Sequence, residues 1–181
     1  MPLFASAADV YFVDNDHSTV SFKVRHLVAN VPGRFLDYSA NLALEPADLT
    51  KSTVEFTVHA ASINTDNADR DKHLRSEDFF FVEKYPTLSF KSEKIVKRSA
   101  DTFDVTGTLT MRGVAKKITV PVEFGGYLKD PWGNEKAGFS TDFTVNRKDF
   151  GINWNKALDQ GGLVLGEDVK ISLSLELNKK K

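Results

Sequence analysis

The chain has 181 residues, 41% hydrophobic and 27% charged, with a formal net charge of −1 at pH 7 and no cysteine. This length fits a single domain, and the lack of cysteine excludes disulfides, a thiolate nucleophile and cysteine-bound zinc. The balanced charge provides no strong global field toward nucleic acid, and no apolar run approaches the roughly 18 residues of a membrane-spanning helix. We therefore expect neither a nucleic-acid partner nor stable membrane insertion.

The first residues, MPLFASAADVYF, contain Ala5-Ser6-Ala7, a small-residue pattern typical of a signal cleavage site. The basic region and full apolar stretch of a signal peptide do not precede it. Two interpretations remain open, the remnant of a signal peptide or a short disordered tail. Residues 1–12 are accordingly predicted to form an N-terminal tail, and residues 13–178 a single folded domain.

Alternation of apolar and polar residues dominates the remaining chain and predicts eight strands. They span residues 18–27, 34–45, 52–62, 87–95, 103–111, 118–124, 139–145 and 169–177. Pro32-Gly33 is expected to break the chain after the first strand. Pro121 lies inside the sixth strand, and because proline cannot donate to a ladder, this strand is predicted to have an edge or a bulge there.

The long interruption in the strand pattern, residues 63–90, contains the one predicted helix. This helix spans about residues 68–76, with Asp66 or Asn67 as its N-cap and Asp71–Arg75 as a favourable i,i+4 pair. The apolar stripe is thin, so we expect a solvated surface helix. Three consecutive phenylalanines at 79–81 follow, and because strand side chains alternate, they cannot all share one face. They are predicted to form the wall or lid of a cavity.

Eight evenly spaced strands and one short helix favour an all-β, antiparallel meander closed into a barrel, with a sandwich as the alternative. Closure removes the exposed edges that a long apolar meander would otherwise present. An eight-stranded barrel either fills with its own side chains or holds one small ligand. The 14 Phe, against 4 Tyr and 2 Trp, suit a hydrocarbon-contacting interior and a phenylalanine-rich core equally well.

Motifs for catalysis and metal binding are missing from the sequence. It contains no GxSxG, P-loop or GxGxxG motif, and its four histidines show no paired spacing. A calcium loop starting at Asp66 would place Ala68, Arg70 and Asp71 where two oxygen ligands and a glycine are required. We therefore predict a binding protein without a metal and without catalytic residues.

Several segments together resemble the YceI-like family of lipocalin-like, polyisoprenoid-binding proteins. They are VDNDHSTVSFKVRHL, NADRDKHLRSEDFF followed by YPTLSF, TGTLTMRGVAKKITVPV, DPWGNEKAGFSTDFTVNRKDFGI and VLGEDVKISLSLE. They occur in the family's order and cover the chain from about residue 13 to 176. The resemblance implies an eight-stranded antiparallel lipocalin-like β-barrel with one or two short helices.

The resemblance also implies a function. A long-chain isoprenoid or similar amphiphilic lipid, of the polyprenyl phosphate, isoprenoid quinone or fatty amide type, would occupy the barrel for storage, transport or stress response. No cofactor is implied beyond this bound lipid or quinone. The family's frequent export favours the periplasm over the cytoplasm, and its frequent dimers make a homodimer one expected assembly. Two alternatives remain, an enzyme acting on the lipid head group and a protein-interaction barrel with a filled core.

Alternation and the phenylalanine run select the residues expected to line the cavity. These are Phe22, Val24, Tyr38, Phe56, Val58, Phe80, Phe81, Phe90, Leu109, Phe139 and Phe143. Arg112 and Arg147 lie near predicted strand ends, where a polar head group would emerge. The bidentate guanidinium suits a diphosphate, which makes both arginines head-group candidates.

Overall fold

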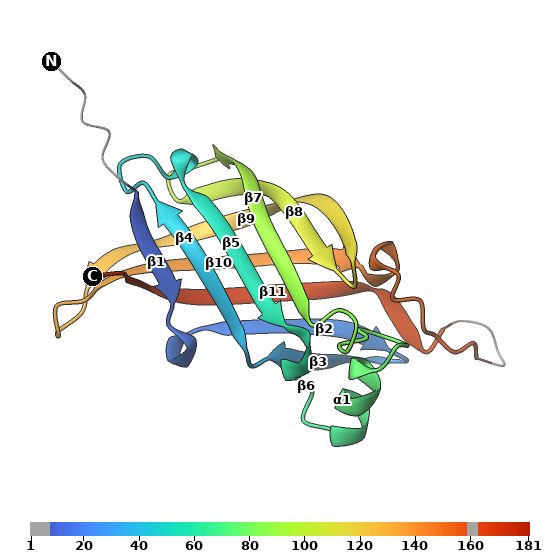
Figure 1. The fold of residues 1–181 in the computed structure, drawn as a ribbon. Coiled ribbons are helices and arrows are strands. Elements are labelled where there is room, and N and C mark those ends of the chain that lie inside the picture. Colours follow the sequence, from blue (N-terminus) through green and yellow to red (C-terminus); the bar gives the residue numbers. More distant parts are fainter. Residues whose placement is uncertain (1–7, 159–162) are drawn as a thin grey trace, which may run out of the picture.

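One antiparallel sheet closes on itself in the computed structural model, which describes residues 8–158 and 163–181 (Figure 1). Within these residues the sheet has eleven strand segments: β1 (Asp9–Val13), β2 (Thr19–His26), β3 (Ala29–Phe35), β4 (Tyr38–Leu44), β5 (Thr53–His59), β6 (Ile63–Asn64), β7 (Thr87–Lys97), β8 (Thr102–Met111), β9 (Val114–Lys129), β10 (Glu135–Asn146) and β11 (Leu165–Lys179). The ring runs β1–β4–β5–β7–β8–β9–β10–β11 and closes where β11 pairs with β1. The predicted eight-stranded antiparallel barrel is therefore confirmed, and the sandwich is excluded.

The barrel is extended at one end by β2, β3 and β6. The long β11 pairs with β2 over residues 165–174 and with β1 over residues 177–179, and a 3-10 turn, η1 (Asn15–His17), separates β1 from β2. β1 begins at Asp9, inside the stretch expected to be a tail, because residues 9–13 pair with β4 and β11. The Ala5–Ala7 pattern lies outside the described residues.

The expected break at Pro32-Gly33 is wrong. Both residues lie inside β3, and the chain reverses instead at Leu27 and Val28, where Leu27 has a φ of 49°. β3 pairs with β2 on one side and, on the other, with β6 only at Arg34 and Phe35. Pro32 therefore lies in an edge strand, where the missing N–H costs no ladder bond.

The irregularity predicted at Pro121 is present between β9 and β10. Their pairing has a register shift at Gly138/Phe139 and ends where Ser140 faces Glu123. Pro121 lies just beyond this end and pairs with Asp104 of β8 only. The two strands therefore separate from Pro121 toward the end of the barrel that carries the helix.

The helix α1 (Ala68–Arg75) begins after Asn67, whose Oδ1 accepts from the Arg70 N–H at 2.9 Å. The helix is exposed or half-buried except at Asp71, as expected of a surface helix, but the predicted Asp71–Arg75 pair is wrong. Asp71 is only 6% exposed and accepts from Thr65 N at 2.8 Å and Thr65 Oγ1 at 2.5 Å. Arg75 donates to the carbonyl oxygens of Ala61 and Ile63, both at 2.8 Å. These bonds fasten the helix to the segment that precedes it.

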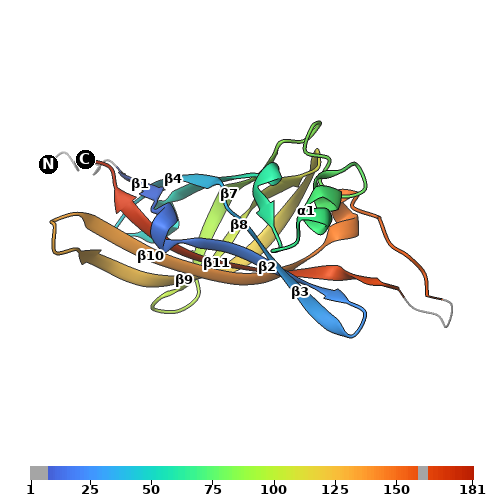
Figure 2. The same cartoon turned by 90° about the horizontal axis from the view of Figure 1, so that it is seen from below.

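α1 lies at one end of the barrel, and the β9–β10 hairpin and the C-terminus lie at the other (Figures 1 and 2). Three further 3-10 turns are described, η2 (Leu49–Lys51), η3 (Ala60–Ser62) and η4 (Arg147–Phe150). No helix among the described residues is long and apolar enough to cross a membrane.

Candidate ligand-binding cavity

A cavity of about 610 Å³ lies inside the barrel. This volume falls in the range of about 300–1,000 Å³ that is typical of small-molecule sites. The cavity is lined by residues of β2, β3, β4, β5, β7, β8, β9, β10 and β11, together with α1 and the residues after it. Of the 45 lining residues, 34 are apolar.

The exposure of β11 shows that the interior is hollow. Ile171, Leu173 and Leu175 point inward and line the cavity, yet each is only partly buried. Leu177, two residues further along the same face, is completely buried. An inward leucine that keeps exposed surface borders empty space, because close packing in a filled core would cover that surface. The filled-core alternative is therefore not the structure of this barrel.

Nine of the eleven residues expected to line the cavity do so: Phe22, Val24, Phe56, Val58, Phe80, Phe90, Leu109, Phe139 and Phe143. Their contact with a bound ligand stays a prediction. Tyr38 and Phe81 are not among the lining residues.

Tyr38 and Phe81 are held elsewhere by specific contacts. The Tyr38 hydroxyl donates to the Ser18 carbonyl at 2.7 Å, and its ring stacks on Phe56 at 6.0 Å, so Tyr38 is part of the packed wall. Burial raises the pKa of Tyr38. Phe81 has a φ of 50°, which turns its ring against Tyr85 at 6.1 Å. The alternation of apolar and polar residues cannot reveal either contact. The Tyr38 hydrogen bond depends on the position of Ser18, between η1 and β2, and the Phe81 contact depends on a residue in the left-handed region.

The charged and imidazole groups of the cavity gather at the α1 end. They are His26, Asp69, Arg70, His73 and Arg147. Three of the lining residues are exposed to solvent: His26, Asp69 and Arg70. The cavity therefore reaches solvent between the β2–β3 hairpin and α1. The opposite end is closed by buried residues such as Leu44 and Phe103.

Asp69, Arg70 and His73 were missed by the sequence analysis, which treated α1 as a solvated surface helix. Arg70 is anchored at the opening by bonds from Nε to Thr65 Oγ1 and from Nη2 to Thr65 O, both 2.7 Å. His73 contacts the rings of Phe79 and Trp154 edge-on at 5.0 and 5.1 Å, and its Nε2 lies 2.8 Å from Asp78 Oδ2. One signal in the sequence could have identified these three residues: they are polar residues of a helix that directly precedes a run of phenylalanines.

The two head-group candidates differ in the structure. Arg147 lines the cavity, is 4% exposed and donates to the carbonyl oxygens of Gly166, Ile152 and Trp154 at 2.7–2.8 Å. Burial lowers the pKa of Arg147, and the nearby Glu167 partly opposes this effect. Arg112 does not line the cavity, because its guanidinium donates to the Gly151 and Glu77 carbonyls and bridges two loops.

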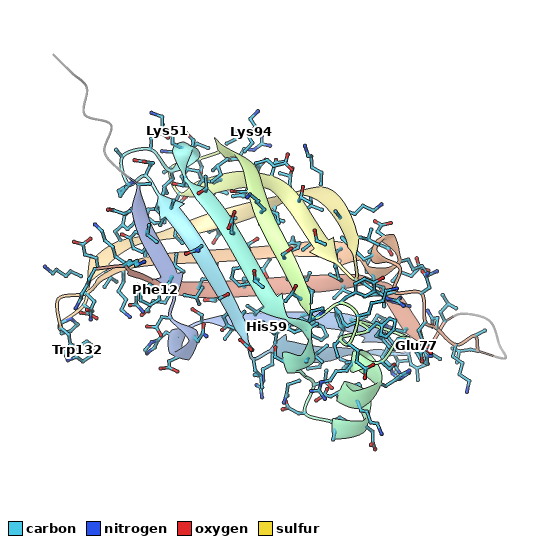
Figure 3. All side chains as sticks on the ribbon, viewed as in Figure 1. Phe12, Lys51, His59, Glu77, Lys94 and Trp132 are labelled. Atoms are coloured by element: carbon cyan, nitrogen blue, oxygen red, sulfur yellow. The ribbon has the colours of Figure 1, made fainter. Side chains whose placement is uncertain are left out.

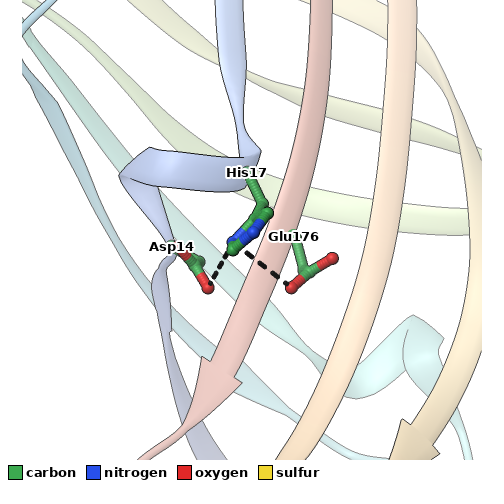
Figure 4. A group of neighbouring side chains, drawn as sticks. All are labelled: Asp14, His17 and Glu176. Atoms are coloured by element: carbon green, nitrogen blue, oxygen red, sulfur yellow. Dashed lines mark ion pairs between the residues drawn. The ribbon is translucent and has the colours of Figure 1, made fainter. Parts of the chain in front are cut away.

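A cluster of possible metal ligands lies on the outside of the barrel, away from the cavity. Within the described residues, Asp14, His17 and Glu176 bring their ligand atoms within 4.8 Å of one another (Figure 4). The Lys136 ammonium donates to Asp14 Oδ2 at 2.8 Å and to Glu176 Oε1 at 2.7 Å. These bonds hold the pKa of Asp14 well below its ordinary value. A cation would have to compete with an ammonium group already bound by both carboxylates.

Comparison with known proteins identifies the family of this chain. Residues 11–177 match the model of the YceI-like domain. A UPF0312 protein of Staphylococcus epidermidis is 39% identical over 91% of this chain and 95% of its own, and one of Vibrio parahaemolyticus is 41% identical over 84% and 82%.

Solved structures agree with this assignment. The YceI protein of Campylobacter jejuni is 34% identical, with a TM-score of 0.75 and full coverage of both chains. A domain from Saccharophagus degradans, described as a polyisoprenoid binding domain, shares the fold at a TM-score of 0.72 and 14% identity over 97% of this chain and 100% of its own. The chain described here belongs to the YceI-like family.

Proposed function

We propose that this protein binds a long-chain isoprenoid or similar amphiphilic lipid without transforming it. The hydrocarbon chain lies along the apolar interior, and the head group lies at the α1 end. One observation carries the proposal: the inward strand faces enclose an apolar hollow, and its charged residues gather at the end that opens to solvent.

The energetics of such a site are dominated by the chain. Each methylene removed from water contributes about 0.8 kcal/mol, so a long tail needs few polar contacts. At roughly 30 Å³ per water-sized group, the cavity accommodates on the order of twenty such groups. Affinity then increases with chain length until the cavity is full, and head-group selectivity is loose.

The polar end of the cavity suits head groups that accept hydrogen bonds. Arg70, His73, His26 and Arg147 supply hydrogen-bond donors or positive charge beside the apolar interior. A phosphate, a quinone carbonyl and a carboxamide all accept such bonds. The description of the Saccharophagus degradans neighbour as polyisoprenoid-binding supports the isoprenoid class at the level of the fold. Storage, transport or a stress response in the periplasm is the role we propose for the complex.

The decisive experiment is extraction of the purified protein with organic solvent, followed by mass spectrometry. We expect one or a few long-chain amphiphiles in an amount close to that of the protein. Delipidated protein is then offered prenyl alcohols of increasing length, and uptake is expected to increase with length up to a limit. Protein that contains no lipid and takes up no alcohol of any length would refute the proposal. Conversion of a prenyl diphosphate by the protein would favour an enzyme instead.

A further inference from the structure

Two neighbouring hairpins at the open end of the cavity present aliphatic side chains to solvent. One is the β2–β3 turn at Leu27 and Val28, and the other is the segment around Leu158 and Leu163. We call these four residues the apolar rim. The Leu27 N–H donates to the Val164 carbonyl at 2.9 Å, and Ala157 pairs with Leu163, so the hairpins lie side by side. Figure 2 shows both projecting beyond the barrel at the end that carries α1.

The turn at Leu27 and Val28 is unusual in its residues. Two-residue hairpin turns favour Asn, Asp and Gly, because these residues tolerate a positive φ. Leu27 nevertheless has a φ of 49°, and Val28 is 89% exposed. A leucine in the left-handed region lowers stability, and Val28 gains nothing from burial because it is almost fully exposed. Their presence at this tip indicates a requirement for apolar side chains that the fold itself does not impose.

The rim is continuous with the opening of the cavity. His26, next to Leu27, and Leu165, two residues after Leu163, both line the cavity. A basic group also lies there, because Arg25 Nε donates to the Leu27 carbonyl at 2.8 Å. Among the described residues, Arg25 forms no ion pair with a carboxylate. The end where the cavity opens therefore combines protruding aliphatic residues with a positive charge.

We propose that the apolar rim inserts into the surface of a lipid bilayer and that lipid enters the cavity there. This builds on the proposed lipid-binding function and adds the surface through which the lipid is exchanged. Aliphatic tips enter the boundary between head groups and acyl chains, while Arg25 attracts anionic head groups. A protein partner fits less well, because stable interfaces bury about 800 Å² per partner and the four side chains of the apolar rim offer far less.

The test uses a double variant, Leu27→Gly with Val28→Asn, that places glycine at the one turn residue with a positive φ and a polar turn residue after it. Neither residue lines the cavity, and the melting temperature is expected to be unchanged or higher. Co-sedimentation with vesicles of phosphatidylcholine and phosphatidylglycerol is expected to fall at least about tenfold, since two aliphatic side chains no longer leave water. Uptake of geranylgeraniol is expected to slow from vesicles and to be unchanged from detergent solution.

The matched control is Trp132→Ser at the opposite end of the barrel. Trp132 is 84% exposed in the β9–β10 hairpin, and Figure 3 shows it far from Glu77, which follows α1. This variant is expected to bind vesicles like the unaltered protein. Loss of vesicle binding in Trp132→Ser but not in the double variant would overturn the proposal. So would a dimer of the unaltered protein that dissociates in the double variant while vesicle binding is absent.

Two outcomes separate this proposal from the proposed function. Uptake of geranylgeraniol from detergent without any vesicle binding refutes the docking surface and leaves lipid binding intact. Vesicle binding that requires Leu27 and Val28, without geranylgeraniol uptake from either source, supports the docking surface and refutes the bound lipid.

Discussion

The ring of Phe22 lies directly over Gly33 on the neighbouring strand. A β-carbon at Gly33 would come within 2.3 Å of Phe22 Cζ. Phe22 and Gly33 face each other in the β2–β3 pair, and Phe22 lines the cavity. The glycine therefore lets the ring lie flat against the barrel wall, which keeps the interior open at this position.

Gly33→Ala is expected to push the Phe22 ring into the cavity. The clash is with the end of a side chain, so the ring can move and the melting temperature should change little. Uptake of geranylgeraniol should fall more than uptake of farnesol, because the ring shortens the available space. The measurement is uptake by delipidated protein together with thermal melting. Unchanged uptake of both alcohols would show that the ring moves away from the ligand.

Gly107→Ala is the matched control for this glycine prediction. A β-carbon there would lie 2.3 Å from the Lys91 carbonyl oxygen, which belongs to the backbone of β7. Backbone cannot move aside without disturbing the β7–β8 pairing, so the free energy of unfolding should fall by about 1–3 kcal/mol. Chemical denaturation should therefore separate the two alanine variants clearly.

Phe143→Trp is expected to reduce the cavity from the inside. Phe143 lines the cavity and is only partly buried, so the larger ring can enter empty space at little cost in stability. Uptake of long prenyl alcohols should then decrease before that of short ones. Overpacking of a filled core would instead cost about 1–3 kcal/mol. A lower melting temperature with unchanged uptake at every length would contradict the prediction.

Phe12→Trp provides the same substitution on the outer face of the barrel. Phe12 is 47% exposed, and Figure 3 shows it on β1, outside the barrel. Neither the melting temperature nor the uptake profile should change. An effect on uptake equal to that of Phe143→Trp would show that ring size acts through the fold and not through the cavity.

Arg147→Met is expected to destabilise the protein by about 3 kcal/mol or more. It leaves the carbonyl oxygens of Ile152, Trp154 and Gly166 without their donor, and each unsatisfied buried group costs about 1–3 kcal/mol. Arg147→Lys should restore little, because a single ammonium cannot reproduce the planar fork. Urea denaturation measures the free energy of unfolding of both variants.

Arg112→Met is the comparison for Arg147→Met. Lipid uptake by Arg112→Met should persist, because Arg112 does not line the cavity.

Lys136→Met tests the ion cluster that joins η1, β10 and β11. Lys136 and Asp14 are only 13% and 14% exposed, and hydrogen bonds to a charged group contribute about 1.5–3 kcal/mol each. Because Asp14 is the buried partner and Glu176 is more exposed, the free energy of unfolding at pH 7 should fall by about the value of one such bond, 1.5–3 kcal/mol. Lys51→Met removes an exposed pair at 3.6 Å and should change it by less than about 1 kcal/mol.

The effect of Lys136→Met depends on pH in a defined direction. The folded-state pKa of Asp14 lies below the ordinary value because Lys136 donates to it. Its contribution is therefore complete above the unfolded pKa of about 3.9 and is lost as the pH falls through the folded value. In urea denaturation the two stability curves should begin to converge below about pH 5 and should continue to do so as the pH falls toward the folded-state pKa of Asp14. A constant difference across this range would show that Lys136 acts through packing alone.

The sequence by itself determined seven of the eight strands of the ring and favoured their closure, whereas most of β1 was assigned to the N-terminal tail. Apolar residues at every second position predicted eight strands, and an apolar meander of that length is stable only when its edges are paired. The helix and its Asn67 cap followed from local residue chemistry, as did the irregularity near Pro121. The inward faces also followed, which is why Phe22, Phe56 and Phe143 were selected correctly as cavity-lining residues.

Only the tertiary structure decided whether the barrel is hollow and where it opens. The alternation of apolar and polar residues shows which side chains point inward but not whether the space beyond them is filled. The sequence pattern around Leu173 would therefore be the same in a filled core and in a hollow barrel. Tyr38 and Arg147 depend on carbonyl groups far away in the sequence or in irregular loops, which no periodicity encodes. The β2–β3 turn lies at Leu27 and Val28 against local preference, because the register of β2 with β3 and β11 outweighs the cost of one left-handed leucine.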